Sequence, residues 1–135
     1  MKFPNVPDVV RRRMASIRSR DTKPELIVRR LAHACGYRFR LHRRDLPGSP
    51  DLVFPRHRKV IFVHGCFWHR HACPLGTKKP KTRLEYWLPK LNRNVSRDAG
   101  NLKSLKELAW RSLVVWECET KKPERLARRI ASFLR

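Results

Sequence analysis

The chain has 135 residues, and its 33 Lys and Arg against 11 Asp and Glu give a formal net charge of +22 at pH 7. This length fits one domain with a core of its own, and the absence of a secretory leader or a run of membrane-spanning length predicts a cytoplasmic protein with no membrane partner. Because the positive charge runs along the whole chain and is mixed with apolar segments, it favours a folded protein that binds nucleic acid.

Residues 1–20 are the first predicted element, a basic arm that lies along phosphates rather than a solvated helix. Its apolar residues, among them Met14 and Ile17, recur at near-helical spacing between arginines. A helix is predicted to begin at Thr22–Glu25, which matches a capping box with a proline in the first turn. Gly36 is expected to end this helix.

The spacing of apolar residues in this first helix predicts the stripe that faces the core. That stripe is expected to contain Leu26, Ile27, Arg30 and Leu31. Cys35 lies at the end of the helix with no partner ligand nearby in sequence, so we interpret it as a buried thiol.

Three strands are predicted to follow. Tyr37–Leu41 alternates like a strand, and after the turn Pro47–Pro50 a second strand begins at Asp51–Phe54. The basic turn Pro55–Lys59 then leads into Val60–Val63, whose β-branched and aromatic composition is typical of a strand buried on both faces. The shared face of the first strand is expected to contain Tyr37, Phe39 and Leu41.

The second half of the chain predicts a helix, a strand and a closing helix. Thr82–Ala109 is helix-like, with an expected break at Pro89 and a weak point at Gly100. Ser112–Cys118 has the composition of a buried strand, and Pro123–Leu134 is amphipathic. This order predicts an α/β fold, a small central mixed sheet flanked by helices, with a crossover helix before the last strand. The apolar face of the long helix is expected to contain Leu102, Leu105 and Leu108.

A dense cluster of cysteine and histidine follows the buried strand Val60–Val63. Cys66, His71 and Cys73 lie close together, and Cys118 ends a strand that is expected to lie beside the buried one. Three thiols and one imidazole fit a tetrahedral structural zinc site, which has no open position for water and would hold the loop in place. The alternative is a chance cluster of reduced thiols, and the density of ligands argues against it.

Two histidines, His64 and His69, remain after these four ligands are assigned. A neutral imidazole is a suitable base for activating water, and Asp51, which opens the adjacent strand, could hold Mg²⁺ nearby. An acid, a cation and a base are what phosphodiester hydrolysis requires. An aspartate in this position alone would more often cap a turn or strand.

The adjacent aromatics Phe67 and Trp68 lie within the same loop, and we expect that both cannot pack easily into one core. Insertion between DNA base pairs, joined by Trp87, is one interpretation. The other is that Trp68 packs while Phe67 shields the zinc site. The basic loop that follows carries Lys78 and Lys79, which we expect to contact phosphates.

These motifs closely resemble those of the very-short-patch repair (Vsr) DNA mismatch endonucleases. The resemblance runs from about residue 8 to residue 133, and it rests on the segments Met14–Glu25, Pro50–Asp51, His64–Cys73 and Val115–Cys118. It implies an arm, 1–20, and a restriction-endonuclease-like endonuclease domain, 21–135, acting as a monomer near the nucleoid of a bacterial-type cell. It also implies a nick on the 5′ side of the thymine in a T·G mismatch. Such mismatches arise where 5-methylcytosine deaminates, so a cytosine-5 DNA methyltransferase is the implied functional partner.

Carried over residue by residue, the resemblance assigns roles in the chemistry. Asp51 becomes the Mg²⁺ ligand and His69 the general base, with supporting roles for His64 and Glu25. Zinc is assigned to Cys66, His71, Cys73 and Cys118, as the spacing suggests independently. The intercalating aromatics become Phe67, Trp68 and Trp87, and the minor-groove contacts become Met14 and Ile17.

The chain departs from related nucleases at Val63, where a second acid usually stands. Its backbone carbonyl could still bind Mg²⁺, which accepts carbonyl oxygen, and His69 would stand in for the missing lysine. Two alternatives stay open: a less selective restriction-type DNA nuclease that cuts matched duplex, and a zinc module that binds DNA without cutting it.

Overall fold

A computed structural model describes residues 22–74, 76–77 and 83–135. The predicted arm 1–20, with Met14 and Ile17, and the loop residues Lys78 and Lys79 lie outside these described residues. None of the described helices is long and apolar enough to cross a membrane. The elements are α2 (Lys23–Ala34), β1 (Arg40–Leu41), β2 (Leu52–Phe54), β3 (Lys59–His64), α3 (Leu84–Glu107), β4 (Arg111–Trp116) and α4 (Pro123–Leu134), with short 3-10 turns η1 (Pro55–His57) and η2 (Glu117–Lys121).

The four strands form one mixed sheet in the order β1-β2-β3-β4. The pairs β1–β2 and β2–β3 are antiparallel, whereas β3 and β4 are parallel. A parallel pair needs a long crossover, and α3 supplies it. The predicted α/β class, the order of its elements and the mixed sheet are confirmed.

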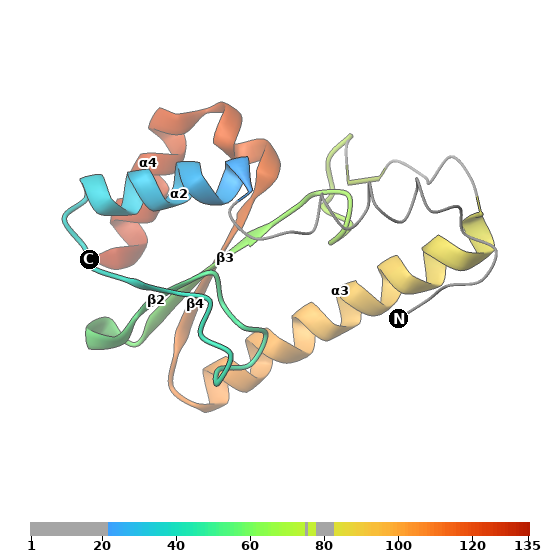
Figure 1. Cartoon of the computed structure of the whole chain (residues 1–135), viewed down its shortest axis with the longest axis horizontal. Coiled ribbons are helices and arrows are strands. Elements are labelled where there is room, and N and C mark those ends of the chain that lie inside the picture. Colours follow the sequence, from blue (N-terminus) through green and yellow to red (C-terminus); the bar gives the residue numbers. More distant parts are fainter. Residues whose placement is uncertain (1–21, 75, 78–82) are drawn as a thin grey trace.

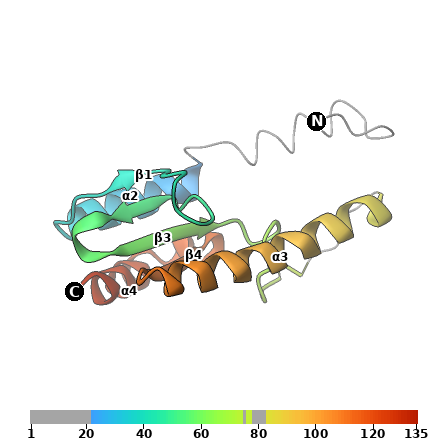
Figure 2. The same ribbon diagram turned by 90° about the horizontal axis from the view of Figure 1, so that it is seen from below.

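Helices cover both faces of the sheet (Figures 1 and 2). Because side chains alternate along a strand, Leu52 and Phe54 of β2 pack with α2 and α4 on one face. Val53, between them, packs with Leu105 of α3 on the other face. The result is a three-layer arrangement in which the long α3 runs past the sheet toward the loop that follows β3.

Helix α2 begins as predicted, with the hydroxyl of Thr22 accepting a hydrogen bond from the backbone amide of Glu25 at 3.4 Å. The apolar stripe predicted for α2 is wrong in part, because Leu26 is 41% exposed. The buried face of α2 carries Glu25, Val28 and Ala32 instead. Cys35 is only half-buried, which corrects its interpretation as a buried thiol.

Two predicted strands are shorter than expected. Only Arg40 and Leu41 pair in β1, and Leu41 is 42% exposed, so it does not share the core face of Tyr37 and Phe39. At the other edge, β4 ends at Trp116, and Cys118 lies in the turn η2 that follows. Strand pairing stops where the neighbouring strand stops, since β3 has its last paired residue opposite Trp116.

Helix α3 continues through Pro89 and Gly100, where a break and a weak point were expected. Proline removes one backbone hydrogen bond and crowds the preceding turn, but this helix buries side chains on both sides of that position. The buried residues of α3 are Trp87, Leu91, Asn94 and Leu105. Leu108 is 52% exposed, so its expected place on the apolar face is wrong.

Candidate active site and metal centre

Three strand ends meet at one edge of the sheet and bring the predicted site residues together. Leu52 pairs with Ile61 across the antiparallel β2–β3 ladder, so the start of β2, next to Asp51, lies beside the end of β3. In the parallel β3–β4 pair, His64 lies opposite Trp116. The loop after β3 and the turn after β4 therefore leave the sheet side by side.

The structure brings the four predicted zinc ligands into one cluster. One ligand atom from each of Cys66, His71, Cys73 and Cys118 lies within 4.8 Å of the others. The Nδ1 atom of His71 lies 3.7 Å from the Cys66 sulfur and 3.5 Å from the Cys118 sulfur. Three thiols and one imidazole at this spacing fit a tetrahedral zinc ion, the geometry of closed structural sites.

Backbone groups hold this cluster in place. The amide of Cys118 donates to the Cys66 sulfur at 3.4 Å, and the amide of Gly76 donates to the Cys73 sulfur at 3.3 Å. Burial raises the pKa of the Cys66 thiol to about 12, so its thiolate requires a nearby cation. A Cβ at position 76 would lie 1.9 Å from the His71 carbonyl oxygen, so this approach requires glycine.

The histidines that are not part of the cluster stack on each other. The rings of His64 and His69 are parallel within 5°, with centroids 3.8 Å apart. Burial, and then the proximity of His69, lowers the pKa of His64 to about 4, so His64 is neutral near pH 7. The Nδ1 atom of His69 forms a short hydrogen bond with the carboxylate of Asp98.

Asp98 is a site residue that sequence reasoning missed. It lies on α3, and together with Trp87, Leu91 and Asn94 it continues one helical stripe at spacings of three and four residues. Asn94 on the same stripe donates to the backbone carbonyl of Trp68 at 3.2 Å. Polar residues on an otherwise apolar stripe were the available signal, because they indicate that the helix faces a polar site at that point.

Asp51 is half-buried and immediately precedes β2. Its Oδ2 atom accepts a hydrogen bond from the backbone amide of Val63 at 2.6 Å. Burial raises the pKa of Asp51 to about 7, and the Val63 hydrogen bond only partly offsets this effect. One ligand atom each of Glu25, His42 and Asp51 lies within 4.8 Å of the others, so this group could hold a cation.

Because the pKa of Asp51 is raised in the folded protein, we expect its ionisation to lower the free energy of unfolding. In an unfolded chain this carboxyl titrates near about pH 4. Since the folded state binds the proton more tightly, stability falls as pH rises from about 4 to 7, and the cost is full above 7. The free energy of unfolding of Asp51→Asn should therefore exceed that of the wild type by about 1–3 kcal/mol at pH 8 and equal it at pH 4. Urea denaturation at the two pH values measures this difference.

The matched control is Asp45→Asn. It is measured without added Mg²⁺, as are the wild type and Asp51→Asn. Asp45 is exposed and its pKa is lowered by a hydrogen bond from Arg43, so its replacement should give no gain at pH 8. An Asp51→Asn variant no more stable than the wild type at pH 8 would contradict the cost assigned to the buried carboxylate.

The predicted DNA-inserting aromatics lie in a cluster between the zinc loop and α3. Trp68 is 8% exposed and Trp87 is 5% exposed, and both pack with Leu91. Phe67 packs edge-to-face on Trp68 at 5.2 Å and is half-buried. Trp68 is therefore part of the buried cluster, whereas Phe67 lies against it and keeps part of its ring accessible.

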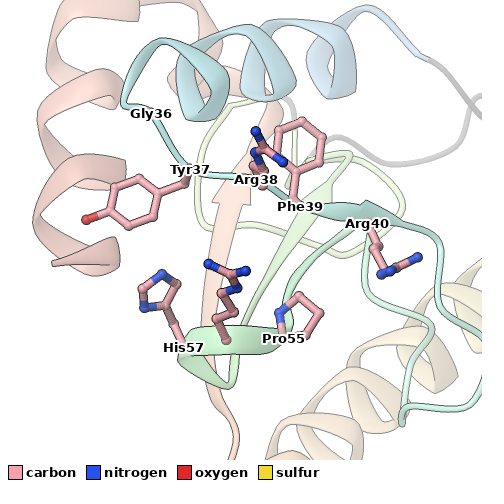
Figure 3. Close-up of a pocket in the computed structure, with 8 residues that line it drawn as sticks. Gly36, Tyr37, Arg38, Phe39, Arg40, Pro55 and His57 are labelled. Atoms are coloured by element: carbon pink, nitrogen blue, oxygen red, sulfur yellow. The ribbon is translucent and has the colours of Figure 1, made fainter.

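A separate concave region lies at the opposite end of β2 from Asp51. It is a pocket of about 690 Å³ between the segment Gly36–Arg40 and η1, with Tyr37, His57 and several arginines around it (Figure 3). This pocket includes none of the predicted site residues. The candidate active site is therefore the group of polar residues at the strand ends, not this pocket.

The chain is similar to known DNA endonucleases. A profile of the family described as DNA mismatch endonuclease Vsr matches residues 6–75. The chain is 50% identical over 128 residues to the type II nicking enzyme V.XorIIP of Xanthomonas oryzae pv. oryzae, a match that covers 95% of this chain and 93% of that protein. It is 47% identical over 113 residues to the DNA mismatch endonuclease Vsr of Escherichia coli, covering 84% of this chain and 72% of that protein. The type II nicking enzyme V.NmeAIP of Neisseria meningitidis is 40% identical over 108 residues, covering 80% and 76%.

Proposed function

The chain belongs to the Vsr DNA mismatch endonuclease family, and from that premise we propose that it nicks one strand of duplex DNA on the 5′ side of the thymine in a T·G mismatch. The observation that supports this proposal best is the convergence at one sheet edge of Asp51 with the His64–His69–Asp98 group. A carboxylate that can bind a cation, beside an imidazole that can accept a proton, provides what phosphodiester hydrolysis requires.

In this proposal, Asp51 and the backbone carbonyl of Val63 would hold Mg²⁺, with Glu25 in support. When bound, Mg²⁺ would supply positive charge to offset the charge that develops at the phosphorus. The residues fit such an ion, because carboxylate and carbonyl oxygens are the ligands that Mg²⁺ prefers and the Val63 amide already fixes one oxygen of Asp51.

His69 is assigned as the general base. Its Nδ1 atom is paired with the carboxylate of Asp98, and in the neutral tautomer Nδ1–H donates, which leaves Nε2 as the proton acceptor. A carboxylate that orients a histidine in this way also stabilises the imidazolium formed when the proton arrives. His64, neutral and stacked against His69, limits the movement of that ring.

The ligands Cys66, His71, Cys73 and Cys118 would hold a structural zinc ion. Such an ion would tie the turn after β4 to the loop after β3, and this loop carries His69. We propose that zinc positions the base in this way and takes no part in hydrolysis, because four protein ligands leave no open position for water.

We further propose that residues 21–135 form a monomeric, restriction-endonuclease-like domain and that 1–20 is a DNA-contacting arm. The described residues place one carboxylate, Asp51, against the Val63 amide, and one such site supports cutting of one strand. Because T·G pairs arise by deamination of 5-methylcytosine, the proposed cellular counterpart is a cytosine-5 DNA methyltransferase. Contacts to DNA are assigned to Met14, Ile17, Lys78 and Lys79.

Mismatch selectivity is assigned to the aromatic cluster, with half-buried Phe67 as the inserting side chain and the buried tryptophans Trp68 and Trp87 as its support. A T·G step is easier to open than a matched one, so an inserting ring converts deformability into selectivity.

Phe67→Ala should weaken binding to a T·G duplex by about 1–3 kcal/mol and barely change binding to matched duplex. Paired dissociation constants at two salt concentrations measure this, with Lys78→Gln as the control that weakens both alike. Equal losses on both duplexes for Phe67→Ala would contradict insertion.

The function itself is tested on end-labelled duplexes that differ only in one T·G pair. We expect nicking with Mg²⁺ on the mismatched duplex, none with EDTA, and much slower cutting of the matched duplex in every sequence context tried. Equal cutting of matched DNA would favour a less selective nuclease instead. Binding without any cutting would favour a zinc module that only binds DNA.

A further inference from the structure

His42 lies beside Asp51 and has no role in the function proposed above. The two residues flank the turn that contains Gly48, and the backbone amide of His42 donates to the carbonyl of Asp51 at 3.2 Å. His42 has a φ of +50, in the left-handed region that few residues other than Gly adopt, although Asn, Asp and His do so more often than the rest. The surrounding structure therefore holds His42 in an uncommon conformation next to the predicted metal ligand.

The contacts of the His42 ring favour one tautomer. Nη2 of Arg29 lies 3.1 Å from Nε2 of His42, and Oε2 of Glu25 lies 3.5 Å from the same nitrogen. The guanidinium contact is the shorter of the two. A guanidinium group has donors and no acceptor, so this contact is a hydrogen bond only if Nε2 accepts it and the proton of the neutral ring is on Nδ1. The same Nη2 atom donates to Oε2 of Glu25 at 3.1 Å, and that carboxylate anchors Arg29 in place.

The protonated nitrogen faces the proposed metal ligand. Nδ1 of His42 lies 3.8 Å from Oδ1 of Asp51, which is an electrostatic contact longer than a direct hydrogen bond. Oδ2 of the same carboxylate accepts from the amide of Val63. The two oxygens of Asp51 therefore each face an N–H group, one from the neighbouring strand and one from the ring of His42.

We infer that His42 is a positioning residue for Asp51, and that Glu25 and Arg29 act on Asp51 through it. The Nδ1–H group orients the carboxylate so that its free lone pairs point toward the cation. This inference rests on the proposed function of Asp51 as metal ligand. It assigns Glu25 a specific task, which is to hold the arginine that sets the tautomer of His42.

The tautomer can be measured directly on the wild-type protein without DNA or Mg²⁺. Long-range ¹H–¹⁵N spectra of protein with ¹⁵N-labelled histidine distinguish the two neutral tautomers, and the His42 signals are assigned by their loss in His42→Asn. In the neutral ring we expect the proton to be on Nδ1. A neutral ring with its proton on Nε2 would overturn the inference.

The functional test compares His42→Ala with His42→Asn as a function of Mg²⁺ concentration. Asparagine tolerates a positive φ, and its side-chain amide offers a donor close to the position of Nδ1–H, whereas alanine offers none. We expect His42→Ala to raise the Mg²⁺ concentration for half-maximal nicking at least about fivefold. For His42→Asn, the Mg²⁺ concentration for half-maximal nicking should stay within about threefold of the wild-type value. His33→Ala, which replaces an exposed histidine on α2, should have the wild-type value.

The outcomes separate this inference from the proposed function. If His42→Ala has the wild-type Mg²⁺ dependence, or if His42→Asn is as defective as His42→Ala, the positioning role is wrong while the function of Asp51 stands. If the wild type fails to nick any duplex, the proposed function is wrong, and the spectra still report the tautomer. Zinc content and melting temperature, measured on each variant, identify a general folding defect.

Discussion

Asp51→Ala and His69→Ala are each expected to abolish nicking of a T·G duplex, with rate losses of at least about 10²–10⁴-fold. Asp51 supplies the only carboxylate that the described residues place against the Val63 amide at the sheet edge. His69 is the histidine paired with a carboxylate of α3. Neither side chain is needed to hold the duplex, so gel-shift affinity for mismatched DNA should stay within about tenfold.

Asp98→Asn refines this test. The amide keeps the size of the carboxylate but permits the wrong tautomer of His69 and does not stabilise its charged form, so we expect a large loss in rate with little loss in binding. Asp45→Asn, which replaces an exposed aspartate, should nick like the wild type. A normal rate for Asp51→Ala or His69→Ala would show that the chemistry is assigned to the wrong residues.

Cys118→Ser should release the structural metal and lower the melting temperature by about 10 °C or more. Its sulfur lies 3.5 Å from the His71 ring nitrogen, and it alone among the four ligands comes from the turn after β4. Losing it disconnects that turn from the loop that carries His69. Zinc content per chain and thermal unfolding, measured on the same sample, check both effects.

Cys35→Ser is the matched control for this substitution. Cys35 is half-buried at the end of α2 and is outside the metal cluster, so its replacement should leave zinc content unchanged. One zinc per chain in Cys118→Ser, together with an unchanged melting temperature, would refute the four-ligand assignment.

Local signals in the sequence were sufficient to place most of the fold. The Thr22 cap located the start of α2 and Pro123 the start of α4, because capping and proline preferences act within a single turn. The candidate metal ligands can be predicted because three of them lie in one loop and the fourth follows a strand of recognisable composition. The break expected at Pro89 does not occur, because tertiary burial along α3 outweighs the lost hydrogen bond.

Partners from distant elements were harder to find. Asp98 lies on α3 and meets His69 only because Trp87, Leu91 and Asn94 on the same stripe dock against the loop. His42 carried no periodic signal, since its position depends on how the turn before Asp51 folds back. Side-chain burial was also unpredictable where two rings pack edge-to-face, as in the aromatic cluster.

The most direct test of the central claim maps the cut on both strands of one duplex in one reaction. A duplex with a single T·G pair carries a different 5′ fluorophore on each strand, and the products are sized at nucleotide resolution after incubation with Mg²⁺. The proposal predicts one product, from the thymine strand, ending at the phosphodiester on the 5′ side of that thymine, with the guanine strand intact. Cuts in both strands, or the same cut in the matched duplex, would contradict it.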